Sequence, residues 1–113
     1  MHEMSIALSI FDIARERASL EKADRVVEIE MDIGTMAGIE FPALEFALEN
    51  CTKESPFTDT EFVINKIQAK ARCRDCQEVF EIINLYDNCP LCQSYDLEIL
   101  AGKELKIKSI LIE

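Results

Sequence analysis

Two different patterns of hydrophobic and polar positions run along the chain, and they predict different elements. Residues 5–20 carry apolar side chains at helical spacing: Ala7, Ile10, Phe11, Ala14 and Ala18, with Ile6 and Ile13 widening the apolar face. A face that wide is typical of a helix that lies against a sheet. A second stripe predicts another helix that begins near Pro42, since proline is tolerated in the first helical turn: Leu44, Ala47, Leu48 and Cys51.

Alternation of apolar and polar residues predicts strands. In residues 25–34 (RVVEIEMDIG), four apolar residues alternate with acidic ones, which is the pattern of a half-buried strand. Residues 60–67 (TEFVINKI) predict a second strand. Residues 104–113 (ELKIKSILIE) predict a third, with Leu105, Ile107 and Leu111 facing inward. The expected fold class is α+β: a small sheet of about three strands with two helices.

A segment that holds four of the five cysteines interrupts this pattern. Cys73 and Cys76 (CRDC) are followed, after twelve residues, by Cys89 and Cys92 (CPLC). Two residues between cysteines allow one tight turn to direct both sulfurs at the same ion, and two such turns complete a tetrahedral shell of four sulfurs that suits Zn²⁺. Residues 78–83 (EVFEII) are expected to form a strand that leads out to a loop, as in a zinc ribbon. A closed shell has no open coordination position, so the predicted zinc is structural.

Zinc accounts for the four cysteines better than iron or coincidence does. Iron in a rubredoxin-like site usually has glycine after the second cysteine of each turn, where this chain has Gln77 and Gln93. Four unrelated buried thiols rarely show this spacing. The segment is too small to bury a core of its own, so the metal has to supply stability, on the order of 10–16 kcal/mol for structural zinc in small peptides. Cys51 is expected to be a small buried hydrophobe without a role.

Composition narrows the possible partners and the compartment. The chain has 22 acidic and 12 basic residues and a formal net charge of −10, which disfavours nucleic acid and anionic membranes as partners. It contains no apolar run of about 18 residues and no secretion signal. We therefore expect a cytoplasmic protein, in which thiols stay reduced and five cysteines indicate metal before disulfide.

The opening residues, MHEMS, place the single histidine at position 2. Met1 is expected to be retained, because the enzyme that removes initiator methionine prefers a small second residue. The Met1 amine, the deprotonated His2 amide and the imidazole Nδ1 can close fused chelate rings around Ni²⁺ or Cu²⁺ in a square plane. The Glu3 backbone nitrogen offers a fourth donor, and a carboxylate such as Glu3 or Glu40 can lie nearby. A histidine at position 2 is by itself far more often part of a solvated chain end, so these residues alone leave both interpretations open.

Five motifs in one order decide between them: MHE, IGTMAGIE (residues 33–40), CRDC, CPLC and the closing GKELKIKSILIE. Together they resemble the HypA/HybF family of hydrogenase nickel-incorporation proteins, over essentially the whole chain. The resemblance implies a small α/β nickel-binding domain (residues 1–68 and 102–113) that carries an inserted zinc-binding domain (residues 69–101). It also implies the metal ligands. His2 is the essential nickel ligand, the Met1 amine and the backbone at His2 and Glu3 complete the site, Glu40 is an extra ligand or nearby support, and zinc is held by Cys73, Cys76, Cys89 and Cys92.

The function implied is that of a metallochaperone, with Ni²⁺ as cargo and Zn²⁺ as a structural ion. The expected partners are a nickel-insertion GTPase and the large subunit of a [NiFe] hydrogenase, and the chain is expected to be a monomer or a homodimer. The alternative is a zinc-ribbon interaction module in transcription or translation. It is disfavoured because EVFEIINLYDN, between the cysteine pairs, contains no Lys or Arg. An enzyme is disfavoured as well, since there is no second histidine to act as base and the zinc shell is closed.

Overall fold

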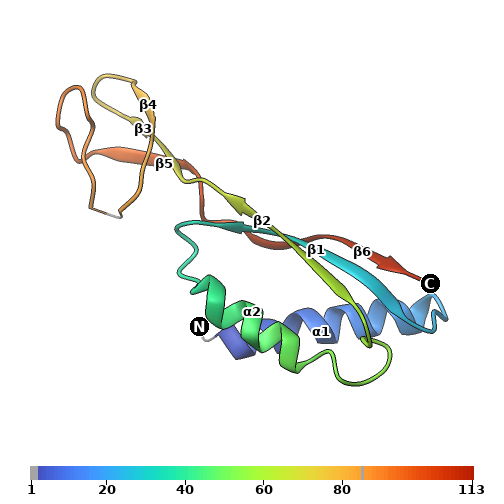
Figure 1. The fold of residues 1–113 in the computed structure, drawn as a ribbon. Coiled ribbons are helices and arrows are strands. Elements are labelled where there is room, and N and C mark those ends of the chain that lie inside the picture. Colours follow the sequence, from blue (N-terminus) through green and yellow to red (C-terminus); the bar gives the residue numbers. More distant parts are fainter. Residues whose placement is uncertain (1–2, 85) are drawn as a thin grey trace. The chain divides into compact units, whose positions relative to one another are not determined.

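The computed structural model describes residues 3–84 and 86–113, and it confirms the predicted α+β class. Its elements in chain order are α1 (Glu3–Leu20), β1 (Val26–Gly34), α2 (Phe41–Asn50), β2 (Glu61–Ile67), β3 (Lys70–Cys73), β4 (Val79–Glu81), β5 (Leu97–Ala101) and β6 (Leu105–Ile112) (Figure 1). The strands form two three-stranded sheets, in the orders β2-β1-β6 and β4-β3-β5.

The described chain divides into two compact units. Unit 1 comprises the described residues up to Met31 together with Ile39–Ile64 and Ile107–Glu113. Unit 2 comprises Asp32–Gly38 and Asn65–Lys106. Strands β1, β2 and β6 contribute residues to both units, and the second sheet lies entirely within unit 2.

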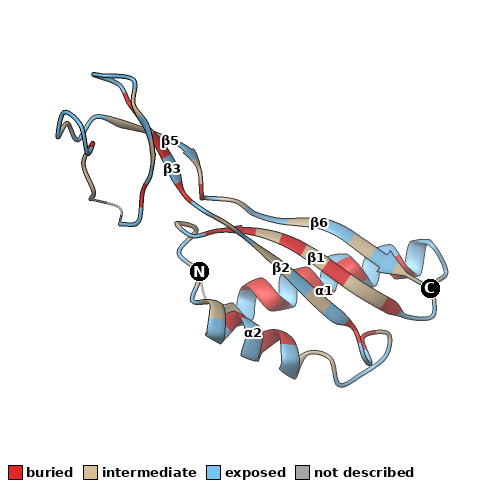
Figure 2. Cartoon of the chain, turned by 45° about the horizontal axis from the view of Figure 1, so that its top comes forward, coloured by how far each residue is buried: buried red, intermediate tan, exposed pale blue. Residues whose placement is uncertain are grey.

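The core of unit 1 lies between the two helices and one face of the sheet (Figure 2). Its buried hydrophobic residues are Ile6, Ala7, Ile10, Phe11, Ala14, Ala18, Val26, Ile29, Met31, Leu44, Ala47, Leu48 and Phe57. Both helical stripes expected from the sequence are therefore confirmed at most of their positions. Ile13, at the margin of the first stripe, is 52% exposed, and Cys51 is half-buried.

The loop between α2 and β2 contributes to this core. The Phe57 ring packs edge-on against Phe11, with ring centroids 4.4 Å apart, and Phe11 also meets Phe62 at 5.6 Å. The Thr60 hydroxyl donates a hydrogen bond of 2.6 Å to the Val26 carbonyl, so the one buried polar side chain of this loop has a partner. The loop is thus fixed by packing and by a hydrogen bond to the central strand.

The inward residues of the last strand differ from the prediction. Leu105 and Leu111 are 41% and 56% exposed, whereas Ile110 and Ile112 are half-buried. The alternation shifts at Lys108 and Ser109, two consecutive residues that are both exposed and both reach Glu30, each at 3.5 Å. A strict period of two therefore does not hold across this point.

Unit 2 contains two strands that the sequence pattern did not indicate, β3 and β5. Both pair antiparallel in the second sheet, where Ala71 of β3 lies opposite Phe80 of β4 and Ile99 of β5. The predicted strand over residues 78–83 is shorter, as β4. The unit's small buried core is Ala69, Ala71 and Ile82, with Met36, Phe80, Leu97 and Ile99 packed against it.

Backbone segments of unit 2 approach closely at Gly34 and Gly102. The Gly34 N–H donates to the Glu104 carbonyl at 2.7 Å, and the Met36 N–H donates to the Gly102 carbonyl at 2.7 Å. A Cβ added at Gly34 would lie only 1.9 Å from the Gly102 carbonyl oxygen, so no side chain fits there. Gly38 differs, because its φ is +79° and a Cβ there would meet nothing within 4 Å.

Gly34 and Gly38 give a matched pair of stability tests. Gly34→Ala forces backbone atoms apart, and we expect it to lower the free energy of unfolding by about 3 kcal/mol. Gly38→Ala meets only the left-handed backbone penalty of about 1 kcal/mol. Chemical denaturation of both variants beside the parent chain measures the difference. Equal losses would contradict the steric explanation.

Candidate metal centre

Four cysteine sulfurs converge in unit 2. The Sγ atoms of Cys73, Cys76, Cys89 and Cys92 all lie within 4.8 Å of one another. Two sulfur pairs join the two halves of the motif, at 3.4 Å for Cys73–Cys92 and 3.5 Å for Cys76–Cys89. A tetrahedral ion with metal–sulfur bonds of about 2.3 Å needs sulfurs about 3.8 Å apart, so the cluster fits such an ion.

Each cysteine pair lies in a turn that we call a knuckle: residues 73–78 form the first and residues 89–94 the second. In the first, the Cys73 N–H donates to the Glu78 carbonyl and the Gln77 N–H donates to the Cys73 carbonyl, both at 2.8 Å. The second knuckle repeats both bonds at 2.9 Å, with Ser94 and Gln93 in the corresponding places. The first cysteine of each knuckle is buried and the second is exposed.

Gln77 and Gln93 have left-handed backbones, with φ of +67° and +64°. These are the positions at which rubredoxin-like turns usually have glycine. The turn geometry therefore forms without glycine, although a left-handed residue with a side chain is unfavourable by about 1–2 kcal/mol. The bonds within each knuckle offset this penalty.

The thiols do not ionise alike. The backbone N–H of Cys92, helped by that of Leu91, lowers the pKa of the Cys89 thiol to about 7. The Glu78 N–H lowers the pKa of Cys76, but desolvation and the three neighbouring sulfurs together outweigh it and raise this pKa to about 12. Sulfurs this close resist carrying several negative charges, and a divalent cation removes that resistance. The cluster is chemically suited to hold a metal ion.

Of the residues predicted to bind nickel, the structure describes Glu3 and Glu40. Met1 and His2 lie outside the described residues. Glu3 is the first residue of α1 and is half-buried, and Glu40 is exposed and directly precedes α2. The Glu40 side chain makes no capping hydrogen bond to α2. Both carboxylates belong to unit 1, where Figures 1 and 2 show the two helices beginning at the same end.

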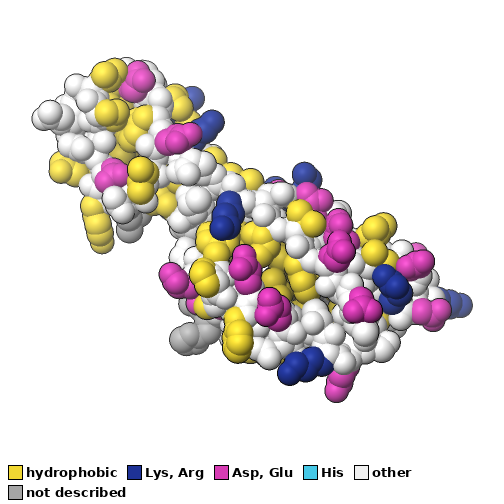
Figure 3. Space-filling view, in the orientation of Figure 1, with side chains coloured by type: hydrophobic (Ala, Val, Ile, Leu, Met, Phe, Trp, Pro, Cys, Tyr) yellow, Lys and Arg dark blue, Asp and Glu magenta, His cyan; other side chains and the backbone are white. Residues whose placement is uncertain are grey.

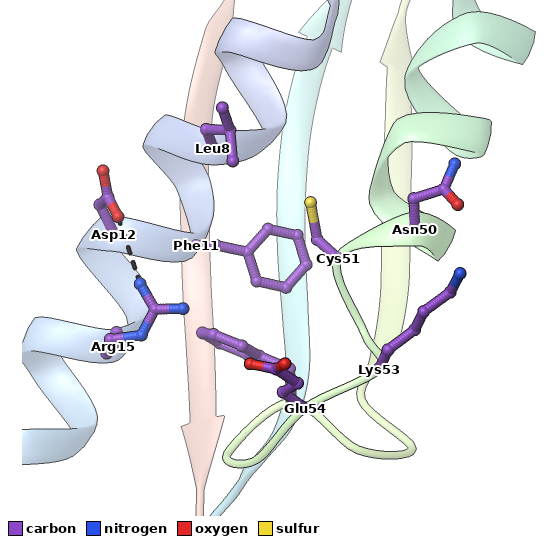
Figure 4. Close-up of a pocket in the computed structure, with 9 residues that line it drawn as sticks. Leu8, Phe11, Asp12, Arg15, Asn50, Cys51, Lys53 and Glu54 are labelled. Atoms are coloured by element: carbon purple, nitrogen blue, oxygen red, sulfur yellow. Dashed lines mark hydrogen bonds and ion pairs between the residues drawn. The ribbon is translucent and has the colours of Figure 1, made fainter.

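The remaining thiol, Cys51, lines a pocket of about 290 Å³ in unit 1 (Figure 4). The pocket wall also includes two basic and two acidic residues: Arg15, Lys53, Asp12 and Glu54. Arg15 is already engaged, since it pairs with Asp12 at 3.3 Å and lies over the Phe57 ring at 5.3 Å from the centroid. The balanced charges select no particular ligand, and Cys51 stays without an assigned role.

Two further properties of the described chain concern membranes and surface charge. No helix in residues 3–84 and 86–113 is long and apolar enough to cross a membrane. Acidic side chains are spread over the face drawn in Figure 3 and outnumber the basic ones there, in keeping with the net charge of −10.

Comparison with known proteins places the chain in a family. The sequence profile described as "Hydrogenase/urease nickel incorporation, metallochaperone, hypA" matches residues 1–112. The chain is 41% identical to the hydrogenase maturation factor HypA of Parabacteroides distasonis, over 100% of this chain and 98% of that protein. It is 38% identical to HypA of Chlorobaculum parvum over the whole of both.

A solved structure agrees with the sequence relatives. The solution structure of the Ni metallochaperone HypA from Helicobacter pylori matches with a TM-score of 0.66 at 25% identity, covering 99% of this chain and 97% of that one. The sequence profile, the relatives and this fold extend over the same residues, and the four-sulfur cluster lies within them. The chain therefore belongs to the HypA family of hydrogenase nickel-incorporation metallochaperones.

Proposed function

We propose that the chain binds one Ni²⁺ at its amino terminus and delivers it during the maturation of a [NiFe] hydrogenase. The observation that carries the proposal is the family match over residues 1–112, which begins at the Met-His-Glu motif. A relative of the same fold is itself described as a Ni metallochaperone. The role requires no catalytic residue, and we propose that the chain is not an enzyme.

The nickel ligands in this proposal are the Met1 amine, the His2 imidazole Nδ1 and the backbone nitrogens of His2 and Glu3. The start of α1 at Glu3 supports this set, because the first four N–H groups of a helix have no intrahelical partner. A metal that displaces the amide proton of Glu3 therefore breaks no helical hydrogen bond. Glu40, whose carboxylate does not cap α2, is proposed as an additional ligand or nearby support.

The ion held by the four cysteines is proposed to be Zn²⁺ in a structural role. Four sulfurs fill a tetrahedral shell and leave no open position, which is the usual form of a structural zinc site. We assign residues 69–101 to the zinc-binding domain and residues 1–68 and 102–113 to the nickel-binding domain. The buried core of unit 2, Ala69, Ala71 and Ile82, falls within residues 69–101, as do the four cysteines.

The proposed partners are a nickel-insertion GTPase and the hydrogenase large subunit, met in the cytoplasm. Several large apolar side chains of unit 2 are exposed in the described chain: Val79 (47%), Ile83 (78%), Tyr86 (84%), Leu91 (69%) and Tyr95 (73%). Exposed aromatic and apolar residues of this kind support a role for the zinc domain in docking. A zinc-bound domain would present them on a rigid support.

The nickel site is tested by titrating the full chain, with its native amino terminus, and His2→Ala with Ni²⁺. We expect one equivalent bound by the parent chain and none by the variant, because the imidazole closes the second chelate ring. The metal absorption band and equilibrium dialysis report the stoichiometry. Glu40→Gln serves as a graded variant that weakens binding without abolishing it. Equal nickel binding by the parent chain and His2→Ala would contradict the proposal.

Nickel affinity should depend on pH. The amine, the imidazole and the peptide nitrogens must all lose protons to bind, so protons compete with the metal. We expect affinity to be highest above pH 7 and to fall as pH decreases through about 6.5, where histidine takes up a proton. Isothermal titration between about pH 6 and 8 measures this, and a constant affinity would rule out nitrogen ligands.

Removal of zinc should loosen unit 2 and leave unit 1 intact, since the buried core of unit 2 contains only Ala69, Ala71 and Ile82. After chelation, chymotrypsin should cut faster at Tyr86 and Tyr95, while the core of unit 1 stays protected. Cys89→Ser should show the fast cutting without a chelator. Cys51→Ser, which lies outside the cluster, should match the parent chain, and the same slow cutting in all four samples would contradict the prediction.

A further inference from the structure

The described residues 82–84 and 86–96 contain the whole second knuckle but no helix or strand. Backbone bonds within the knuckle fix its internal shape. They do not determine how far it lies from the first knuckle. Before a metal ion joins the two knuckles, other contacts have to bring them to the spacing that four sulfurs require.

Two hydrogen bonds of the Ser94 hydroxyl provide one such contact. This hydroxyl, at the end of the second knuckle, donates to Oδ2 of Asp75 in the first knuckle at 2.5 Å. The Ser94 oxygen also accepts the Asp96 N–H at 3.1 Å. One hydroxyl group therefore ties a carboxylate of the first knuckle to the backbone that leaves the second.

Arg74 provides the other contact. Its backbone N–H donates to the Asp96 carbonyl at 2.9 Å. Its guanidinium Nη1 pairs with Asp96 Oδ1 at 3.0 Å and donates to the Leu97 carbonyl at 3.3 Å. Arg74 and Asp75, the two residues between Cys73 and Cys76, thus both bond to residues that follow Cys92.

We propose that Arg74, Asp75, Ser94 and Asp96 form a clamp that positions the two knuckles for the metal. The proposal rests on the proposed occupancy of the four cysteines by zinc. The backbone N–H of Ser94 bonds to the Cys92 sulfur, but no clamp side chain belongs to the group of four sulfurs that can hold the ion, so the clamp residues are positioning residues and not ligands. Groups behind the ligands typically change metal affinity by about 10–100-fold when they are removed.

The clamp acts mainly on release of the ion. For the ion to leave, the two knuckles have to separate, and the clamp contacts resist this separation. If the second knuckle moves away briefly, the same contacts bring it back, and its sulfurs bind the ion again before the ion leaves. Removal of the clamp contacts should therefore speed the dissociation of zinc, with little change in the four-sulfur coordination of the bound ion.

The test follows zinc transfer from the full chain to 4-(2-pyridylazo)resorcinol. We expect Ser94→Ala to release zinc about tenfold faster than the parent chain. Ser94→Thr, which keeps the hydroxyl, should release it at nearly the parental rate. Asp96→Asn should release it faster, because it weakens the pair with Arg74.

The chain offers a matched control for Asp96→Asn. Glu98 pairs with Arg72 at 3.3 Å between β5 and β3, two positions along the chain from Asp96 and Arg74, and this pair joins no residues of the two knuckles. Glu98→Gln should change the release rate by less than about threefold, because the pair that it weakens ties neither knuckle to the other and contributes only as an ordinary surface ion pair. An effect as large as that of Asp96→Asn would overturn the assignment of the clamp to residues 74, 75, 94 and 96.

A double-mutant cycle separates the clamp from a general loss of stability. If Asp75 and Ser94 act on each other, Asp75→Ala with Ser94→Ala should release zinc no faster than the faster single variant. Effects that multiply would overturn the clamp. The Co²⁺-substituted variants should keep the absorption spectrum of a tetrahedral site with four sulfurs, and a changed spectrum would indicate a lost ligand and contradict a positioning role.

The outcomes distinguish the two proposals. A parent chain that holds one zinc, with variants that release it at the same rate, would overturn the clamp and leave the zinc site standing. A parent chain that holds no zinc would overturn the zinc site and the clamp with it. The nickel titration of His2→Ala is independent of both.

Discussion

The second unit depends on bringing four sulfurs together within 4.8 Å. Unit 1 buries two helical faces and a central strand, so the hydrophobic effect stabilises it in the ordinary way. Unit 2 has a much smaller buried core, and much of it is irregular chain. Its strands and knuckles place the sulfurs at metal spacing, where several of them can be ionised together only if a cation binds. The four cysteines that bind the cation therefore also determine whether unit 2 is rigid.

The sequence predicted the parts of the structure that depend on local periodicity and spacing. Both helices and strands β1, β2 and β6 were found within a few residues of the expected bounds, and the CRDC and CPLC spacing indicated the cluster directly. The short strands β3 and β5 were missed. Lys70–Cys73 shows no alternation long enough to recognise, and it becomes a strand because it pairs with partners on both sides.

Some features were unpredictable for the same reason, since they depend on residues distant in sequence. Leu111 was expected inside, but the last strand changes phase at Lys108 and Ser109, where both residues contact Glu30 of the neighbouring strand. The bond between Asp75 and Ser94 spans nineteen positions and joins an exposed and a half-buried polar residue, which no sequence pattern distinguishes from ordinary surface. The metal-binding sulfurs can be identified from the sequence, whereas the groups that position them can be identified only from the folded structure.

The half-buried position of Cys51 has a practical consequence for studies of this protein. It is the one thiol outside the four-sulfur cluster among the five cysteines of the chain. With a metal on the cluster, the other four sulfurs are engaged and poorly nucleophilic toward alkylating reagents, while Cys51 faces a pocket of about 290 Å³ that accommodates a small probe. A fluorophore or spin label can thus be attached to unit 1 at a single site without engineered cysteines. Modification of further thiols would then report, molecule by molecule, the loss of the metal from unit 2.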